Sequence, residues 1–239
     1  MISQEQHSSR QYDQELDDLR TRVLQMGGLV TAQVRDAIDA FVTGNVDEMQ
    51  RVDDEDQRVN GFEVGIDEVS AYIIARRQPA ASDLRMLLGI SKIVTDLERC
   101  GDEAAKIARI SRAIHERERG HFPNPQDIRD ISSIAGSMLQ TSLDTFARLD
   151  ATAAAGVMLA DREIDARFHA TLRQLITFMM EDPRTISTSL DIIFIAKALE
   201  RIGDHAKNMA EQVIYIVRGT DVRHQDPERI GQQVQQAPQ

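Results

Sequence analysis

The sequence lacks the cysteines that cross-link small secreted proteins and the long apolar runs that span membranes. Its 239 residues include one cysteine, Cys100, and no tryptophan, and aromatic side chains make up 4%. A single cysteine excludes an intramolecular disulfide framework and favours a reducing compartment. No apolar run approaches the roughly 18–20 residues that cross a bilayer, and the N-terminus lacks the pattern of a secretory signal. We therefore expect a cytoplasmic protein that meets the membrane only through partners.

Positive charge is also in short supply. Lys and Arg number 28 against 39 Asp and Glu, which gives a formal net charge of −11 at pH 7. Because proteins bind phosphate backbones with Lys and Arg, this sign argues against nucleic acid as the main partner. It fits cations or basic protein surfaces better, and charge alone does not choose between the two.

Helix-forming residues with helical spacing are abundant. Apolar side chains such as Leu19, Val23, Met26 and Val30 recur every three or four residues, and helix breakers lie far apart. The breakers are Thr43–Asn45, Gln78–Pro79, Gly120–Pro125 and Asp182–Pro183. The pattern predicts helices over about 8–42, 46–77, 80–117, 126–150, 154–181 and 184–218, followed by a polar, frayed tail over 220–239.

The second group of three helices repeats the first. The segment Leu97–Asp102 (LERCGD) in the third helix returns as Leu199–Asp204 (LERIGD) in the sixth. A glycine inside a helix costs about 1 kcal/mol against alanine, so Gly101 and Gly203 at equivalent places predict a close helix–helix approach. With the same offset, one apolar face of the third helix falls on that of the sixth. We predict an all-α fold of two tandem antiparallel three-helix bundles, residues 8–119 and 124–219.

Acidic residues stand beside this apolar face in both halves. Glu98 and Asp102 are four residues apart and share a helical face, and Glu200 and Asp204 repeat them. The second predicted helix carries a stripe of oxygen-bearing side chains, and the fifth carries part of it: Asp56, Asn60, Glu63 and Asp67, then Asp161 and Asp165. Like charges at this spacing repel, and oxygen-rich sites suit Mg²⁺, Ca²⁺, Mn²⁺ or iron.

Two interpretations of these carboxylates stay open. If the second and third helices of each half pack antiparallel, the acidic stripes face each other and cations would neutralise them. Alternatively the carboxylates form a solvated face, and Arg99 and Arg201 serve as their counter-ions. His205 is a weaker candidate for a metal site, because its counterpart in the first half is Glu103.

Catalytic motifs are missing from the sequence. The only Glu-x-x-His spacing, Glu118/His121, falls in a Gly/Pro loop, which argues against a ferritin-like di-iron centre. Cys100 aligns with Ile202, so we interpret it as a small core residue rather than a nucleophile. No phosphate-binding loop, nucleophile elbow or Cys/His zinc spacing is present. We expect a protein that is not an enzyme.

Several motifs in their order and spacing resemble those of the PhoU family, the accessory proteins of phosphate-specific transport. Gln78–Arg85 leads to Leu97–Asp102 in the first half, and Met180–Arg184 leads to Leu199–Asp204 in the second. The resemblance covers nearly all of residues 8–219 and departs from the family's usual Glu-Arg-Ile-Gly-Asp at Cys100. It implies two three-helix bundles, often as a homodimer, with Mg, Mn, Zn or Fe ions held by acidic motifs in some members. By position, the metal ligands would be Asp56, Asn60, Glu63, Glu98, Asp102, Asp161, Asp165, Glu200 and Asp204.

The same resemblance implies a function. Members of the family act in the cytoplasm at the inner membrane, where they connect the ATPase of the phosphate ABC transporter with a phosphate-sensing histidine kinase. They repress phosphate uptake and the phosphate-starvation response. Phe168 stands where the first half has Glu63, so the second site would hold fewer ions. The residues alone leave a metal-binding adaptor or metal buffer, a purely structural adaptor and a metal-dependent phosphohydrolase as alternatives.

Overall fold

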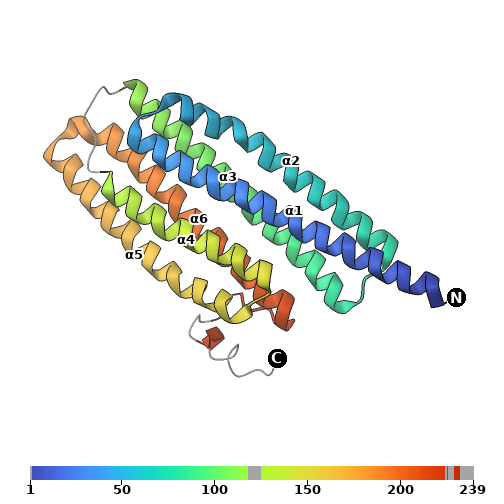
Figure 1. The fold of residues 1–239 in the computed structure, drawn as a ribbon. Coiled ribbons are helices and arrows are strands. Elements are labelled where there is room, and N and C mark those ends of the chain that lie inside the picture. Colours follow the sequence, from blue (N-terminus) through green and yellow to red (C-terminus); the bar gives the residue numbers. More distant parts are fainter. Residues whose placement is uncertain (1, 118–124, 224, 226–228, 232–239) are drawn as a thin grey trace.

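The computed structural model describes residues 2–117, 125–223, 225 and 229–231. Over these residues the chain forms helices and no strand, so the predicted all-α fold is confirmed. The elements are α1 (Ile2–Thr43), α2 (Val46–Arg77), α3 (Ala81–Arg117), α4 (Gln126–Arg148), α5 (Ala151–Glu181), the short 3₁₀ helix η1 (Pro183–Thr185) and α6 (Ile186–Arg218) (Figure 1).

The helices form two sets of three that lie side by side (Figure 1). Short connections join α1 to α2 and α4 to α5, so consecutive helices run antiparallel. The third helix of each set lies at the centre of the molecule: α3 packs on α1, α2 and α6, and α6 packs on α3, α4 and α5. The two predicted bundles therefore share a long contact between α3 and α6, with a second contact between α1 and α4.

Caps and left-handed residues fix the helix ends. Gly44 has φ 72°, and the Asn45 side chain accepts a hydrogen bond from the Glu48 N–H at 3.2 Å, which starts α2. Leu149 has φ 52° and ends α4. Asp150 then accepts hydrogen bonds from two backbone N–H groups at the start of α5. Such a cap contributes about 0.5–2 kcal/mol to stability.

The helix boundaries differ from the prediction mainly at these caps. The α2 boundaries agree, whereas α5 begins at Ala151 rather than at residue 154 because Asp150 caps it. For the same reason α4 ends at Arg148 rather than at residue 150. α1 begins at Ile2 rather than at residue 8, and Pro183 opens η1 instead of the sixth α-helix. The predicted break at 120–125 and the Glu118/His121 pair lie outside the described residues, apart from Pro125.

The core is one continuous cluster that spans both halves. Leu97 and Leu199 are fully buried on the two central helices, and burial of each contributes about 1.5–3 kcal/mol. The predicted close approach at the paired glycines is confirmed. A methyl group added to Gly101 would lie 3.1 Å from Val59 Cγ1, and one added to Gly203 would lie 2.9 Å from Ile164 Cδ1. Each glycine thus lets its own half's second helix come close to the third.

Polar contacts cross the seam between α3 and α6. The buried Glu103 carboxylate accepts from Arg201 Nη1 across the seam and from Lys106 Nζ on its own helix, each at 2.9 Å. The Cys100 thiol is fully buried and lies 4.0 Å from the Ile202 carbonyl oxygen, and burial raises its pKa well above the usual value. A buried neutral thiol is a poor nucleophile, which agrees with a packing role for Cys100.

The C-terminal segment is not polar throughout. Val222 and Ile230 are buried against the core, although the composition of residues 220–239 predicts a frayed tail. The prediction was wrong for these two apolar side chains because it rested on the average composition of the segment, which is dominated by glutamine, aspartate and proline. Among the described helices, none combines the length and apolar character that a bilayer span requires.

Candidate functional site

Helices α2 and α3 bring the predicted acidic residues of the first half together. We call Asp56, Asn60, Glu63, Glu98 and Asp102 the first acidic cluster. The pKa of Glu98 is raised, first by desolvation and then by the charges of Asp102, Glu63 and Asp56. Desolvation also comes first in raising the pKa values of Asp56 and Glu63, and Asp102 adds to both. These mutual effects place four carboxylates in one electrostatic neighbourhood.

Three buried oxygen atoms at the base of this cluster lack a hydrogen-bond donor: Gln33 Oε1, Asp56 Oδ1 and Asn60 Oδ1. Gln33 reaches the cluster from α1, and its side chain is fully buried, with Nε2 donating to the Val52 carbonyl at 3.1 Å. Its Oε1 and Asp56 Oδ1 lie 3.3 and 3.6 Å from the point where a Gly101 Cβ would stand. Buried oxygens without donors are costly, and a cation is one group that satisfies them.

Helices α5 and α6 carry the second acidic cluster, Asp161, Asp165, Glu200 and Asp204. Its charges are partly neutralised by the protein itself. Lys207 Nζ lies 2.5 Å from Asp161 Oδ2, and Lys197 Nζ lies 2.6 Å from Glu200 Oε1. The pKa of Asp204 is raised, first by desolvation and then by Glu200 and Asp161, while Lys197 lowers it.

The two clusters differ in how they fit a cation. In the described part of the chain, no three His, Cys, Asp or Glu side chains stand ready to hold one metal ion, so binding requires side chains to turn. Both clusters contain buried oxygens without a donor, of the kind that hard cations bind: Gln33 Oε1, Asp56 Oδ1 and Asn60 Oδ1 in the first, and Asp161 Oδ1 and Glu200 Oε2 in the second. In the second cluster two ammonium groups already lie on the carboxylates. The difference between the clusters is therefore one of counter-charge: ammonium groups contact carboxylates of the second cluster, and the first cluster has the better donor set for a cation.

Other residues of the prediction have different partners. Arg201 pairs with Glu103 across the seam rather than with its neighbours Glu200 and Asp204. Arg99 acts on Glu63 and Glu98 only through its charge, which lowers their pKa values. His205 Nδ1 lies 2.9 Å from Asp96 Oδ1, on the first half's central helix. The sequence alone did not identify Gln33 and Lys207, because their neighbours in the clusters lie on other helices. It did not identify Lys197 either, whose partner Glu200 is three residues away on the same helix.

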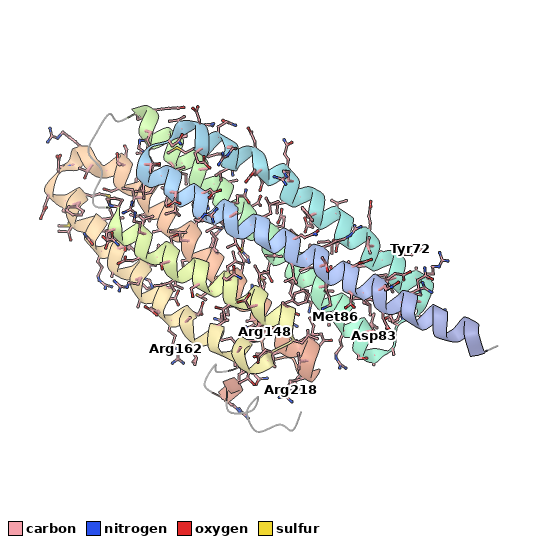
Figure 2. The ribbon with its side chains drawn as sticks, viewed as in Figure 1. Tyr72, Asp83, Met86, Arg148, Arg162 and Arg218 are labelled. Atoms are coloured by element: carbon pink, nitrogen blue, oxygen red, sulfur yellow. The ribbon has the colours of Figure 1, made fainter. Side chains whose placement is uncertain are left out.

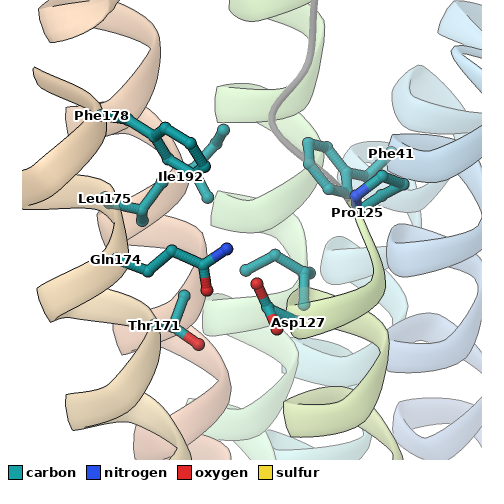
Figure 3. Close-up of a pocket in the computed structure, with 9 residues that line it drawn as sticks. Phe41, Pro125, Asp127, Thr171, Gln174, Leu175, Phe178 and Ile192 are labelled. Carbon is teal, nitrogen blue, oxygen red and sulfur yellow. The ribbon is translucent and has the colours of Figure 1, made fainter. Parts of the chain in front are cut away.

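A groove runs along the seam beside the two clusters. Charged side chains from both central helices line it, among them Arg99, Asp102, Arg201, Asp204 and Lys207. A second hollow lies where α1, α3 and α6 meet, and Asp83 and Met86 are among the residues that line it; both are labelled in Figure 2. A third, between α4 and α5, is bordered by Phe178 and Gln174 on one side and Asp127 on the other (Figure 3), but its cavity of about 10 Å³ has room for one water molecule. The seam groove is therefore the hollow that adjoins the predicted site residues.

Comparison with known proteins agrees with this duplicated architecture. The family model described as the PhoU domain matches residues 23–111 and again residues 128–213. The chain belongs to the PhoU family. The PhoU homologue of Pseudomonas aeruginosa, named a phosphate-specific transport system accessory protein, is 50% identical over 230 residues, which cover 96% of this chain and 94% of the relative. The PhoU protein of Escherichia coli K12, with the same description, is 42% identical over 91% of this chain and 90% of its own length.

Solved PhoU structures share the fold. The crystal structure of PhoU from Pseudomonas aeruginosa superposes with a TM-score of 0.84 at 48% identity, and covers 87% of this chain and 100% of that one. The crystal structure of the phosphate transport system regulatory protein PhoU from Streptococcus pneumoniae gives 0.81 at 26% identity, over 88% of this chain and 99% of that one. The family consists of accessory and regulatory proteins of phosphate transport.

Proposed function

We propose that this protein is an accessory regulator of phosphate-specific transport that keeps the phosphate-starvation response off when phosphate is plentiful. The observation that carries the proposal is the 50% identity to a PhoU accessory protein over 96% of this chain. The alignment covers 96% of this chain and 94% of the relative, so the proposal takes in both halves rather than one shared bundle. In this role the protein acts through contacts with partners and is not an enzyme.

The proposed partners are the ATPase subunit of the phosphate ABC transporter and a phosphate-sensing histidine kinase. The protein docks on both in the cytoplasm, is recruited peripherally to the inner membrane through them, and acts as a homodimer. Exposed apolar side chains on the second half support such docking. They gather near the turn between α5 and α6: Ile176, Phe178, Met180, Ile186, Leu190 and Phe194. Met180, the most exposed of them, keeps 80% of its surface accessible.

A reporter assay tests the regulatory role. Cells that lack this protein are grown in abundant phosphate, and alkaline phosphatase output is compared with that of the parent and of a strain carrying the restored gene. The proposal expects high output in the deletion strain and low output in the other two. Low output in the deletion strain would overturn it. Co-purification of the transporter ATPase and the kinase from phosphate-replete cells then tests the partners separately.

A second candidate function is cation binding by the first acidic cluster. The donor-free oxygens of Gln33, Asp56 and Asn60 favour it, together with the raised pKa values of the neighbouring carboxylates. Mg²⁺, Mn²⁺, Zn²⁺ or iron would supply positive charge and bring the α2 and α3 carboxylates closer together. The protein would then serve as a metal-binding adaptor or metal buffer. A titration of the metal-free protein with Mn²⁺ tests this directly, and absence of binding up to millimolar concentration would rule it out.

A further inference from the structure

The two acidic clusters are duplicates in position but not in their counter-charges. The offset that places Leu97 on Leu199 also places Thr95 on Lys197 and Ala105 on Lys207. Each of these lysines contacts a carboxylate of the second cluster, Lys197 on Glu200 and Lys207 on Asp161. The first half has no amino group at either position. The neutral residues Thr95 and Ala105 of the first half thus correspond to two lysines in the second half, and both lysines lie at the second acidic cluster.

Lys197 and its counterpart Thr95 also have different neighbours on the adjacent helix. Lys197 Nζ lies 5.3 Å from the centre of the Phe168 ring, and Phe168 stands where the first half has Glu63. In the first half, the Thr95 hydroxyl donates to the Ser91 carbonyl at 3.1 Å and, as a polar neighbour of Glu63, lowers the pKa of that carboxyl. A carboxylate–hydroxyl pair in one half therefore corresponds to an aromatic–ammonium pair in the other. A cation over an aromatic face is a favourable contact, so Phe168 helps to hold Lys197 at the cluster.

The base of the second cluster also lacks the oxygen that the first one has. The position beside Gly101 is occupied by Gln33 Oε1, whereas the position beside Gly203 is occupied by Met138 Sδ, at 3.6 Å from the place of a Cβ. Thioether sulfur is a poor ligand for hard cations, and amide oxygen is a good one. With Phe168 and Met138 at these positions, the second cluster still has the carboxylates of Asp161, Asp165, Glu200 and Asp204 to offer a cation, and Asp161 Oδ1 and Glu200 Oε2 are buried without a donor.

The first cluster has cations nearby, but they are engaged elsewhere or remain at a distance. Arg109 Nη1 pairs with Asp53 at 2.7 Å and acts on Asp56 only through its charge. Arg99 acts on Glu63 and Glu98 in the same way. By contrast, Lys207 touches Asp161 directly and is only 29% exposed in its side chain. Among the described residues, direct contact between a cationic side chain and a cluster carboxylate is therefore specific to the second half.

We propose that Lys197 and Lys207 are counter-ions that close the second acidic cluster to divalent cations. In this half of the duplicated chain, two lysine side chains neutralise the carboxylates in place of a metal ion. An approaching metal ion would meet two ammonium groups at the carboxylates it needs and would have to displace both. The inference concerns the selectivity of the second half and does not rest on the regulatory role.

The test counts Mn²⁺ ions bound to the full-length protein by isothermal titration and by electron paramagnetic resonance. The decisive variant carries Lys197→Thr and Lys207→Ala, which introduces the residues of the first half. The expected result is one more bound Mn²⁺ per chain than in the wild type, and loss of this additional ion when Glu200→Gln and Asp204→Asn are added. An unchanged Mn²⁺ count in the folded double variant would overturn the proposal.

Two further variants keep the test decisive if the double variant unfolds, which circular dichroism reveals. Lys207→Gln removes the charge and keeps an N–H donor for Asp161, so it should also increase Mn²⁺ binding at the second cluster. In the wild type, Glu200→Gln with Asp204→Asn should leave the Mn²⁺ count unchanged; a decrease would overturn the proposal. The matched pair Glu98→Gln with Asp102→Asn reports on the first cluster alone, so failure of the proposed first-half site is distinguished from failure of this inference.

Discussion

His205 Nδ1 on α6 lies 2.9 Å from Asp96 Oδ1 on α3, and Asn208 Nδ2 donates to the same oxygen at 3.3 Å. Asp96 is buried, with 8% of its surface exposed, so its carboxylate obtains hydrogen bonds from the opposite half rather than from water. The contact fixes the register of the two central helices.

This relationship predicts the effect of removing one partner. The variant His205→Ala should lower the free energy of unfolding by about 1–3 kcal/mol, because a buried acceptor loses its main donor. The variant Asn208→Ala should cost less, since its hydrogen bond is longer and His205 remains. Urea denaturation of both variants checks the order. Equal and small losses would show that the seam does not depend on this histidine.

Two helical glycines, one on the central helix α3 and one on α1, predict opposite effects on stability. A methyl group on Gly89 of α3 would lie 2.5 Å from Ile216 Cγ1 of α6, so Gly89→Ala should destabilise the protein by about 1–3 kcal/mol through overpacking. The matched control is Gly28→Ala on α1, where no atom lies within 4 Å of the added methyl. It should stabilise the protein by up to about 1 kcal/mol through helix propensity. Thermal unfolding distinguishes the two, and stabilisation by both would contradict the close packing of α3 on α6.

The first acidic cluster predicts a dependence of stability on pH. The pKa of Glu98 is higher in the folded protein than its ordinary value of 4.5, mainly through desolvation. The folded state therefore binds a proton more readily than the unfolded state, so this group's penalty is absent below pH 4.5 and develops as pH rises through the raised pKa.

The variant Glu98→Gln should accordingly raise the melting temperature at pH 7 and have little effect on it at pH 4. The gain at pH 7 should reach at least the few tenths of a kcal/mol that like charges at i,i+4 cost. Differential scanning calorimetry across this range is the measurement. A lower melting temperature at pH 7 would show that the negative charge of Glu98 is needed for folding.

The exposed apolar side chains near the turn between α5 and α6 predict that a substitution there changes regulation without changing stability. Because Met180 is 80% exposed, Met180→Asp should leave the melting temperature unchanged within about 1 °C, a near-zero effect typical of surface substitutions. If this surface docks a partner, the variant should raise reporter output in abundant phosphate. Val64→Asp, which changes an exposed valine of the first half, is the control. Low reporter output with a folded Met180→Asp protein would show that this surface does not dock a partner needed for regulation.

The sequence predicts the architecture well and the charge balance of the sites poorly. Apolar spacing locates the six long helices of the described residues, because a stripe such as Leu19, Val23, Met26 and Val30 has one structural interpretation. The LERCGD and LERIGD segments identify the central helices and their paired glycines. What they do not reveal is which side chains meet. Gln33 reaches the first cluster from α1 and Lys207 reaches α5 from α6, and neither contact follows from a spacing within one helix.

The continuous core across α3 and α6 also indicates why it is an advantage to have both bundles in one chain. One three-helix set alone would leave the seam face of its central helix uncovered, and two separate copies would cover it only at concentrations above their dissociation constant. A covalent link makes this encounter intramolecular, with an effective concentration on the order of millimolar for a short linker. Dilution therefore cannot part the two halves, and the protein can be present at few copies per cell without losing its central contact.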